Sequence, residues 1–360
     1  MGNWRSIHSS AEWDQNLAEI PYAHTLQSWE WGEFKSRWGW SAVRLLWPQA
    51  GRPVAAAQVL ARPIPPTPWQ FMYVTKGPAL DYADPNLADC VFNDLEQYAA
   101  ANGALFIKID PDVPRQFGEP EVDQPLAPVG QAILNMLDRR GWRFSPEQIQ
   151  FRNTVLIDIR PDPDELLARM KSKWRYNIRL AQRSEVEVEV GTTANLPAFY
   201  RMYAETAQRD GFLIRPEAYY MDVWRSFIAV DQAELLLASV KGELVAGMIL
   251  FFLNQSAWYM YGASTEQHRK SMPNHLLQWT AICRAKARGC SQYDMWGAPD
   301  VFDESDGIWG VYRFKRGFGG EVRQGIGAYD YPVRPRLYQT FTQTLPQARS
   351  LLRKLRGQAR

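Results

Sequence analysis

Alternation of apolar and polar residues predicts strands at several points along the chain. The clearest case is Glu185-Val-Glu-Val-Glu-Val190, which alternates perfectly and indicates a strand with valines facing inward and glutamates in water. Residues 151–159 and 105–109 are two further runs of strand length and composition. Strands therefore account for a large part of the expected fold.

A helical period marks the segment after residue 160. Pro161-Asp-Pro-Asp164 starts a helix, because acids in the first turn complement the helix dipole. The segment then carries an apolar stripe and a neighbouring basic stripe: Met170, Trp174 and Ile178 form the first, and Arg175, Arg179 and Arg183 form the second. We expect a single helix that runs through Arg183.

The same series of elements occurs twice. Gly51–Leu60 resembles Gly242–Phe251, and each reads as a turn that enters a strand. A second strand, a helix that closes at Gly103 or Gly289 and a third strand follow each copy, at a nearly constant offset of about 190 residues. Strand pairs followed by a helix and another strand indicate a mixed α/β sheet. We predict an α/β fold of two tandem, duplicated domains like those of the acetyl-CoA-using N-acyltransferases (GNAT-like).

The duplication also sets the expected domain boundaries. The first domain covers residues 1–150 and is completed by residues 325–360, while the second covers residues 151–324. Prolines bracket a last strand and a helix that begins at Leu337, which we expect to return to the first domain: Pro332, Pro335 and Pro346.

Composition indicates where in the cell the protein is expected to be found. The chain has 360 residues, of which 46% are hydrophobic, enough for two cores. No stretch approaches the roughly 18–20 apolar residues that cross a bilayer, and Met1–Ser10 lacks a signal-peptide pattern, so we expect a cytoplasmic protein.

The net charge is +2, yet residues 331–360 hold seven basic and no acidic side chains. Such an end favours a solvated helix face, while contact with phosphate, in RNA or in lipid head groups at the inner membrane face, stays open.

Cysteine and histidine chemistry is not indicated. Cys90, Cys283 and Cys290 are odd in number and form no C-x-x-C pair, so neither a disulfide framework nor a zinc site is expected. The four histidines fall in no metal-ligand or nucleophile-base pattern. We expect no metal.

Acetyl-CoA-dependent acyltransferases start the helix after their central strands with a glycine-rich turn that holds a pyrophosphate. The equivalent places here are Asp81–Asn86 and Arg269–His275, and neither contains glycine. Each contains a proline, which removes a backbone donor. The fold is therefore expected to use a donor other than CoA.

Six segments resemble the Fem family, whose members transfer amino acids from aminoacyl-tRNA to a peptidoglycan precursor. They lie in family order: Gln27–Lys35 with Trp38-Gly39, Met170–Arg179, Tyr261–Ser264, Leu276–Trp279, Tyr293–Gly297 and Tyr312–Gly319. No heptad run is present, so the chain resembles the compact form without a coiled-coil arm. The resemblance implies a muropeptide (UDP-MurNAc-pentapeptide or lipid II) on the first domain, the tRNA 3′ end on the second, and no metal or organic cofactor. We expect a monomer.

The resemblance also implies acceptor contacts. Lys35 matches a phosphate-contacting lysine, Arg215 and Tyr219 match an arginine-tyrosine pair of the same site, and Tyr261 matches a substrate-contacting tyrosine. Two cations that flank a diphosphate make charge-assisted contacts. An exposed helix lysine, a loop ion pair and a core aromatic stay open for Lys35, Arg215 and Tyr261.

The resemblance also implies catalytic residues and residues that contact tRNA. Asp110, which follows the strand of residues 105–109, matches an aspartate near the acceptor amine, with Asp112 as the alternative for the same position. Lys315, preceded by Phe314, matches a lysine beside the aminoacyl ester, where a cation stabilises the oxyanion; a surface basic cluster is the alternative. Sequence-independent tRNA contact and a solvated helix face are both open for the three arginines of the basic stripe, Arg175, Arg179 and Arg183.

Three functions compete at this point. The first is transfer of an aminoacyl group from tRNA to the side-chain amine, lysine or ornithine, of a peptidoglycan stem peptide. The second is an acyl-CoA-dependent N-acyltransferase that acts on cell-envelope material, against which the missing glycine-rich turns argue. The third is a non-catalytic RNA-binding module.

Overall fold

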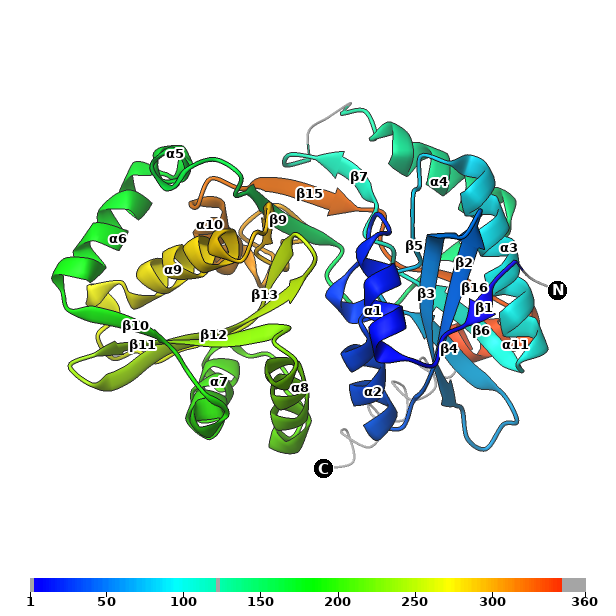
Figure 1. The fold of residues 1–360 in the computed structure, drawn as a ribbon, viewed down its shortest axis with the longest axis horizontal. Coiled ribbons are helices and arrows are strands. Elements are labelled where there is room, and N and C mark those ends of the chain that lie inside the picture. Colours follow the sequence, from blue (N-terminus) through cyan, green and yellow to red (C-terminus); the bar gives the residue numbers. More distant parts are fainter. Residues whose placement is uncertain (1–2, 121–123, 345–360) are drawn as a thin grey trace, which may run out of the picture. The chain divides into compact units, whose positions relative to one another are not determined.

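The computed structural model describes residues 3–120 and 124–344 and divides the chain into two compact units (Figure 1). Unit 1 comprises Met1–Arg115, Leu126–Gln150 and Ile326–Arg360, and unit 2 comprises Gln116–Pro125 and Phe151–Gly325. Residues 116–125, which we expected in the first domain, group with unit 2. The reason is that β7 (Pro114–Phe117) lies next to β15 (Glu321–Gly325), where the Gly118 N–H donates to the Val322 carbonyl at 2.8 Å.

Unit 1 is built on one mixed sheet with helices on both faces (Figure 1). In spatial order its strands are β1 (Arg5–Ser6), β2 (Ser41–Gln49), β3 (Arg52–Pro63), β4 (Gln70–Val74), β6 (Ala104–Ile109), β16 (Tyr329–Tyr331) and β8 (Arg143–Phe144), with β5 (Ala79–Leu80) beside β3. One face packs against α3 (Pro85–Ala101) and α4 (Pro128–Arg139) around buried Val59, Val91 and Ile107. Helices α1 (Ser10–Ala18) and α2 (Trp29–Arg37) lie on the other face.

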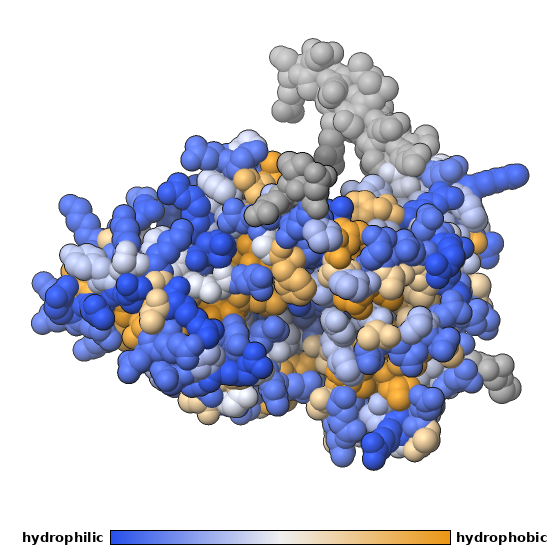
Figure 2. Space-filling view, turned by 90° about the horizontal axis from the view of Figure 1, so that it is seen from above, coloured by the Kyte–Doolittle hydropathy of each residue, from blue (hydrophilic) through white to orange (hydrophobic). Residues whose placement is uncertain are grey.

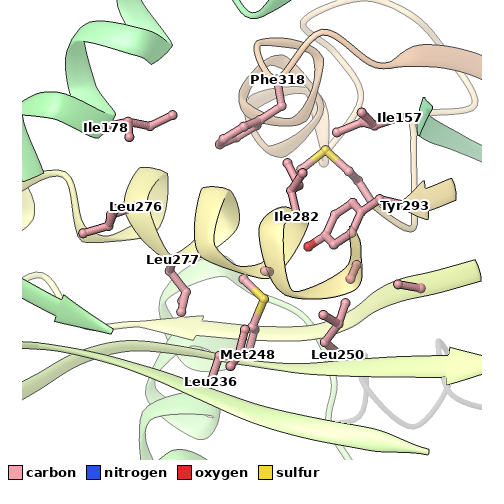
Figure 3. Close-up of a cluster of buried hydrophobic side chains, with 14 of the residues drawn as sticks. Ile157, Ile178, Leu236, Met248, Leu250, Leu276, Leu277, Ile282, Tyr293 and Phe318 are labelled. Carbon is pink, nitrogen blue, oxygen red and sulfur yellow. The ribbon is translucent and has the colours of Figure 1, made fainter. Parts of the chain in front are cut away.

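Unit 2 repeats this plan. Its strand order is β10 (Val186–Val190), β11 (Ala233–Val240), β12 (Glu243–Leu253), β13 (Ser256–Ser264), β14 (Gln292–Asp294), β9 (Asn153–Asp158), β15 and β7. Helices α7 (Leu196–Asp210) and α8 (Glu217–Ala229) lie on one face, and α6 (Ser172–Arg183) and α9 (Pro273–Ala287) lie on the other (Figure 1). Figure 3 shows α9 directing Leu277 toward Met248 and Leu236 of the sheet, in the main core of the unit.

Corresponding turns confirm the predicted duplication. Ala50 and Gly51, between β2 and β3, have φ of 50° and 79°, while Lys241 and Gly242, between β11 and β12, have φ of 52° and 78°. Two successive left-handed residues are the mark of a type I′ hairpin, which matches the twist of the flanking strands. Each copy then forms a parallel strand pair, β4 with β6 and β13 with β14, joined by a helix.

Two local predictions need correction. The helix expected to run from Pro161 through Arg183 is broken into α5 (Pro163–Arg169) and α6, because the Lys171 N–H donates to the Gly317 carbonyl at 3.0 Å instead of continuing the helix. The valines of β10 were all expected to face inward. Val186 is buried, but Val190 is 47% exposed because β10 forms the edge of the sheet.

The returning chain enters unit 1 as β16, followed by α11 (Pro335–Gln339). Lys108 on β6 forms a 2.9 Å ion pair with Asp330 on β16, and both side chains are at most 2% exposed. Ser145 and Tyr338 each donate a hydroxyl hydrogen bond to Asp330 at 2.8 Å. This network ties the last strand to the centre of the sheet.

Most of the basic tail lies outside the described residues, including the region in which we expected a membrane contact. Within residues 3–120 and 124–344, helices with the length and apolar character needed to cross a membrane are absent.

Lys108→Met should lower the free energy of unfolding by about 3–5 kcal/mol, because it leaves the Asp330 carboxylate buried without its cation. Urea unfolding followed by circular dichroism measures the change. Adding Asp330→Asn should recover part of the loss, and Lys241→Met in the exposed hairpin turn should stay within about 0.5 kcal/mol of wild type. A loss at Lys108 no larger than the loss at Lys241 would contradict the interpretation.

Candidate active site

The ends of β13 and β14 frame the first part of the site. The two strands pair in parallel only from Ser256–Trp258 to Gln292–Asp294, and beyond Asp294 the chain turns through Trp296 and Gly297, with φ of 53° and 58°. Helix α10 (Trp309–Arg316) carries Lys315 to this turn. Its ammonium donates to the Gly297 carbonyl at 2.8 Å and also to the Trp296 carbonyl.

Lys315 is a buried cation. Its side chain is 6% exposed, and the neighbouring Arg313 is exposed, so the surface-cluster alternative does not describe it. Burial lowers the pKa of Lys315 to about 7, and the charge of Asp294 opposes this shift. Asp294 also fixes the turn, because its carboxylate accepts the Trp296 N–H at 2.7 Å.

An aromatic group surrounds Phe314. Its ring lies 5.2 Å from His275 and 5.1 Å from Phe318, and its carbonyl accepts the Trp174 indole N–H at 3.0 Å. The Trp174 ring covers Gly317 so closely that a Cβ there would lie 2.0 Å from Cε2, which only glycine avoids. Burial lowers the pKa of His275 to about 4, so the imidazole is neutral at pH 7. Trp174 and Gly317 belong to the segments that resemble the Fem family. Nothing in the sequence marked His275 as a site residue.

The basic stripe on α6 divides into two kinds of residue. Arg175 is half-buried and donates to the Ala168 carbonyl at 3.2 Å and to the Met170 carbonyl, so it caps the end of α5. Arg179 and Arg183 are exposed, and the surface on the α5 and α6 side of unit 2 is largely hydrophilic (Figure 2, left). Of the three arginines, Arg179 and Arg183 are therefore the two whose side chains are exposed to solvent.

Tyr261 lies on the opposite face of the unit 2 sheet from Lys315. A bulge between Ile249 and Leu250 makes Leu250 pair with Tyr259 and Ile249 pair with Tyr261, so these two tyrosines face opposite sides. The Tyr259 ring lies 5.9 Å from the Lys315 ammonium, whereas Tyr261 packs toward α7 and α8.

Arg215 and Tyr219 join Tyr261 on that second face. The exposed Arg215 guanidinium lies 4.9 Å from the centre of the Tyr219 ring, and Tyr220 links Tyr219 to Tyr261 at ring distances of 5.7 and 5.9 Å. Burial raises the pKa of Tyr219 to about 12, so its hydroxyl keeps its proton at neutral pH and can donate a hydrogen bond. The structure therefore groups these three predicted residues and separates them from Lys315 and Phe314.

Asp110 lies in unit 1, directly after β6. Its carboxylate is 4% exposed and accepts the Tyr73 hydroxyl at 2.5 Å and the backbone N–H of Lys76. Burial raises the pKa of Asp110 to about 6, against the opposing charge of Lys76. Tyr73 and Lys76 were not identified from the sequence, where they read as ordinary strand-end residues.

An aromatic row connects Lys35 with Asp110 on one face of unit 1. The half-buried Lys35 ammonium lies 5.3 Å from the centre of the Trp40 ring, which lies 5.7 Å from Phe71. Phe71 stacks on Tyr73 at 6.1 Å, and Tyr73 donates to Asp110. The Trp40 and Phe71 rings meet at 63°, the Phe71 and Tyr73 rings at 14°, and the row has a cation at one end and a carboxylate at the other.

A separate cavity of about 320 Å³ in unit 2 is lined by Leu156, Asp158, Arg169 and Phe318, among others, and by none of the predicted site residues. The described part of the chain also contains no group of three or more metal-ligating side chains.

Comparison with known proteins agrees with this architecture. The model of the FemAB family matches residues 8–244 and 241–345. A lipid II:glycine glycyltransferase from Staphylococcus aureus (strain USA300) is 26% identical over an alignment that covers 94% of this chain and 95% of that protein. The crystal structure of FemX superposes with a TM-score of 0.83 at 25% identity, covering 94% of this chain and all of that chain.

A tandem GNAT protein from the clavulanic acid biosynthesis pathway shares the fold alone, with a TM-score of 0.50 at 10% identity over 92% of this chain and 98% of that one. This likeness confirms the predicted tandem GNAT-like architecture, and the family match extends through both units. The chain belongs to the FemAB family.

Proposed function

We propose that this protein transfers an aminoacyl group from aminoacyl-tRNA to the side-chain amine of a peptidoglycan stem peptide, carried on a nucleotide (UDP-MurNAc-pentapeptide) or a lipid (lipid II). The proposal rests on the end-to-end match to a protein named lipid II:glycine glycyltransferase. Unit 1 is assigned to the acceptor and unit 2 to the donor, and Arg215 of unit 2 keeps its predicted contact with the acceptor. The buried ionisable groups at the ends of the two parallel strand pairs support this assignment.

The reaction needs one base and one oxyanion stabiliser. An alkyl ammonium with a pKa near 10.4 must lose a proton before its nitrogen can attack the ester carbonyl. The C–N bond then forms, the C–O bond to the terminal ribose breaks, and a second amine proton ends on the ribose oxygen. Asp110 suits the first proton transfer, because a pKa of about 6 lies close to working pH.

Lys315 suits the role of oxyanion stabiliser. When the amine adds to the ester, the neutral carbonyl oxygen becomes an oxyanion, and a fixed ammonium stabilises this state more than the ground state. Two carbonyls hold the Lys315 ammonium in place, which leaves its third N–H for the reacting oxygen. Because the pKa of Lys315 is about 7, its contribution should decline as pH rises through neutrality.

Both helix starts argue against a CoA donor. At α3, the Asp84 carboxylate already accepts the N–H groups of Asn86 and Leu87 at 3.0 Å each, and its charge would repel a pyrophosphate. At α9, Pro273 lacks an N–H, and the His275 N–H donates to the Met272 carbonyl at 3.0 Å.

Transfer should depend on intact tRNA. Incubating the protein with a panel of aminoacyl-tRNAs, glycyl-tRNA included, and a muropeptide precursor should yield a mass gain equal to one aminoacyl residue. Ribonuclease treatment of the donor before mixing should abolish the gain. Activity with acyl-CoA alone would overturn the proposal.

Lys315→Met should reduce kcat by about 10²–10³ with little change in affinity for either substrate, because the interaction forms only in the transition state. Methionine keeps most of the stem length. Single-turnover kinetics measure the rate, and Arg313→Met on the exposed side of α10 is the matched control. A folded Lys315→Met protein within threefold of wild type would refute the assignment.

Replacing Lys35 or Arg215 with Met should weaken acceptor binding by roughly 1.5–3 kcal/mol, the range for hydrogen bonds to charged groups. Binding of charged tRNA should be unchanged. Isothermal titration with each substrate separates the two effects, and equal losses for both would indicate misfolding rather than phosphate recognition.

A further inference from the structure

The connection between α7 and α8 exposes three consecutive apolar residues, Phe212, Leu213 and Ile214. Leu213 is 100% exposed and Phe212 is 40% exposed, while Ile214 is half-buried. Among the large hydrophobic side chains that the structure describes, the next most exposed is Tyr176 at 56%. Single exposed apolar residues are common on protein surfaces, but a consecutive run at a loop tip contributes little to a core and marks a binding surface.

Hydrogen bonds hold this loop at both ends. The Phe212 N–H donates to the Ala207 carbonyl at 3.1 Å, and the Phe212 ring lies 5.7 Å from the Tyr203 ring. At the other end, the Arg215 N–H donates to the Tyr220 hydroxyl at 3.3 Å. The tip is therefore presented from fixed ends, so that a partner has little chain to order when it binds.

The apolar tip is continuous with the predicted phosphate contact. Arg215 follows Leu213 by two residues, so their Cα atoms are at most about 7 Å apart. The Arg215 guanidinium lies 4.9 Å from the centre of the Tyr219 ring. Glu217, the next acid along the chain, belongs to the first turn of α8, where it complements the helix dipole. One short loop thus presents apolar side chains next to a cation.

This combination fits the surface of a phospholipid bilayer. Lipid phosphates lie directly outside the acyl region, and apolar side chains of surface-bound proteins reach about 5–10 Å into that boundary. The diphosphate of a lipid-linked acceptor lies at the same level. With Arg215 on a phosphate, Leu213 is close enough along the chain to enter the acyl boundary. A nucleotide-linked acceptor in solution offers no such apolar layer.

We propose that residues 212–214 form a membrane-docking loop, which inserts Leu213 and Phe212 into the acyl boundary of a bilayer while Arg215 stays at the level of the phosphates. The partner of this surface is the bilayer itself. Docking brings Arg215 to the level at which a lipid-linked diphosphate lies, so the loop favours the lipid-linked form of the acceptor. Only this preference rests on the proposed function.

Vesicle flotation tests the docking without any substrate. Vesicles of phosphatidylethanolamine and phosphatidylglycerol, free of prenyl lipid, should bind the protein, and Leu213→Asn should lower the partition coefficient by about tenfold or more. The matched control is Val230→Asn, because Val230 is 45% exposed but follows the other end of the 13-residue α8, about 20 Å away along the helix axis. Equal partitioning of wild type and Leu213→Asn would overturn the proposal.

A second measurement separates docking from folding. Because the Leu213 side chain is fully exposed, Leu213→Asn should leave the midpoint of urea unfolding unchanged. Residues 331–360 carry the same seven basic side chains in every variant, so differences between variants report on the loop. A shifted midpoint that accounts for the lost binding would overturn the role of Leu213.

The charge of the loop has its own test. Arg215→Met should weaken binding to the anionic vesicles by about fivefold, the contribution of one cation at an anionic surface. Binding to vesicles of phosphatidylcholine alone should not change. An Arg215→Met protein that binds the anionic vesicles as wild type does would overturn the placement of Arg215 at the phosphates.

Kinetics test the preference for a lipid-linked acceptor. With the acceptor embedded in vesicles, Leu213→Asn should lower kcat/KM by about tenfold, following the loss of vesicle binding. Transfer to UDP-MurNAc-pentapeptide in solution should stay at the wild-type rate. An equal loss with the soluble acceptor would show that Leu213 contacts the acceptor directly, and would overturn docking as its role.

Two other occupants are outcomes of the same experiments. Vesicle binding that appears only when a prenyl lipid is present would assign the loop to the chain of the substrate. A concentration-dependent dimer that Leu213→Asn abolishes in sedimentation would assign it to a second copy, and either result overturns the proposal. If vesicle binding depends on Leu213 but no aminoacyl-tRNA supports transfer, the proposed function fails and the docking loop stands.

Discussion

Parallel pairing of two strands, made once in each unit, is the constraint on which the candidate site depends. In unit 1 the pair is β4 with β6, and in unit 2 it is β13 with β14. Parallel strands end at the same edge of a sheet, and their connection must cross over through a helix. Each unit therefore presents two adjacent strand ends where buried backbone and side-chain groups must find partners. Asp110 in unit 1 and Lys315 in unit 2 are among the buried groups that find partners there.

The two units place groups of opposite charge at these strand ends. In unit 1 the strands stay paired from Gln70–Val74 to Ala104–Ile109, and a buried carboxylate after the second strand collects donors from Tyr73 and Lys76. In unit 2 pairing stops after three residues, and a buried ammonium collects the carbonyls of Trp296 and Gly297. Desolvation moves both pKa values toward neutrality, to about 6 for Asp110 and about 7 for Lys315. In the proposed reaction, Asp110 is the group that accepts a proton and Lys315 is the group that faces the oxyanion.

Sequence patterns predicted the fold well because the repeated turns have few conformational choices. Gly51 and Gly242 mark type I′ hairpins that only residues tolerant of positive φ can form. The helix break at Lys171 was not predictable, because its cause is a hydrogen bond to Gly317, far away in sequence. Lys76 was missed for the same reason. Its contacts with Asp110 and Asp112 join the ends of two parallel strands, and no local period in the sequence records them.

Burial of charge explains why the site residues are informative beyond their matches to a family. An ammonium at Lys315 enclosed by backbone carbonyls costs free energy that an apolar side chain would not, and stability alone gives no reason to keep it. The same holds for Asp110, whose carboxylate is buried beside a hydroxyl and an N–H rather than left in water. Groups kept in such surroundings have pKa values that respond to small electrostatic changes, and proton transfer near pH 7 requires this.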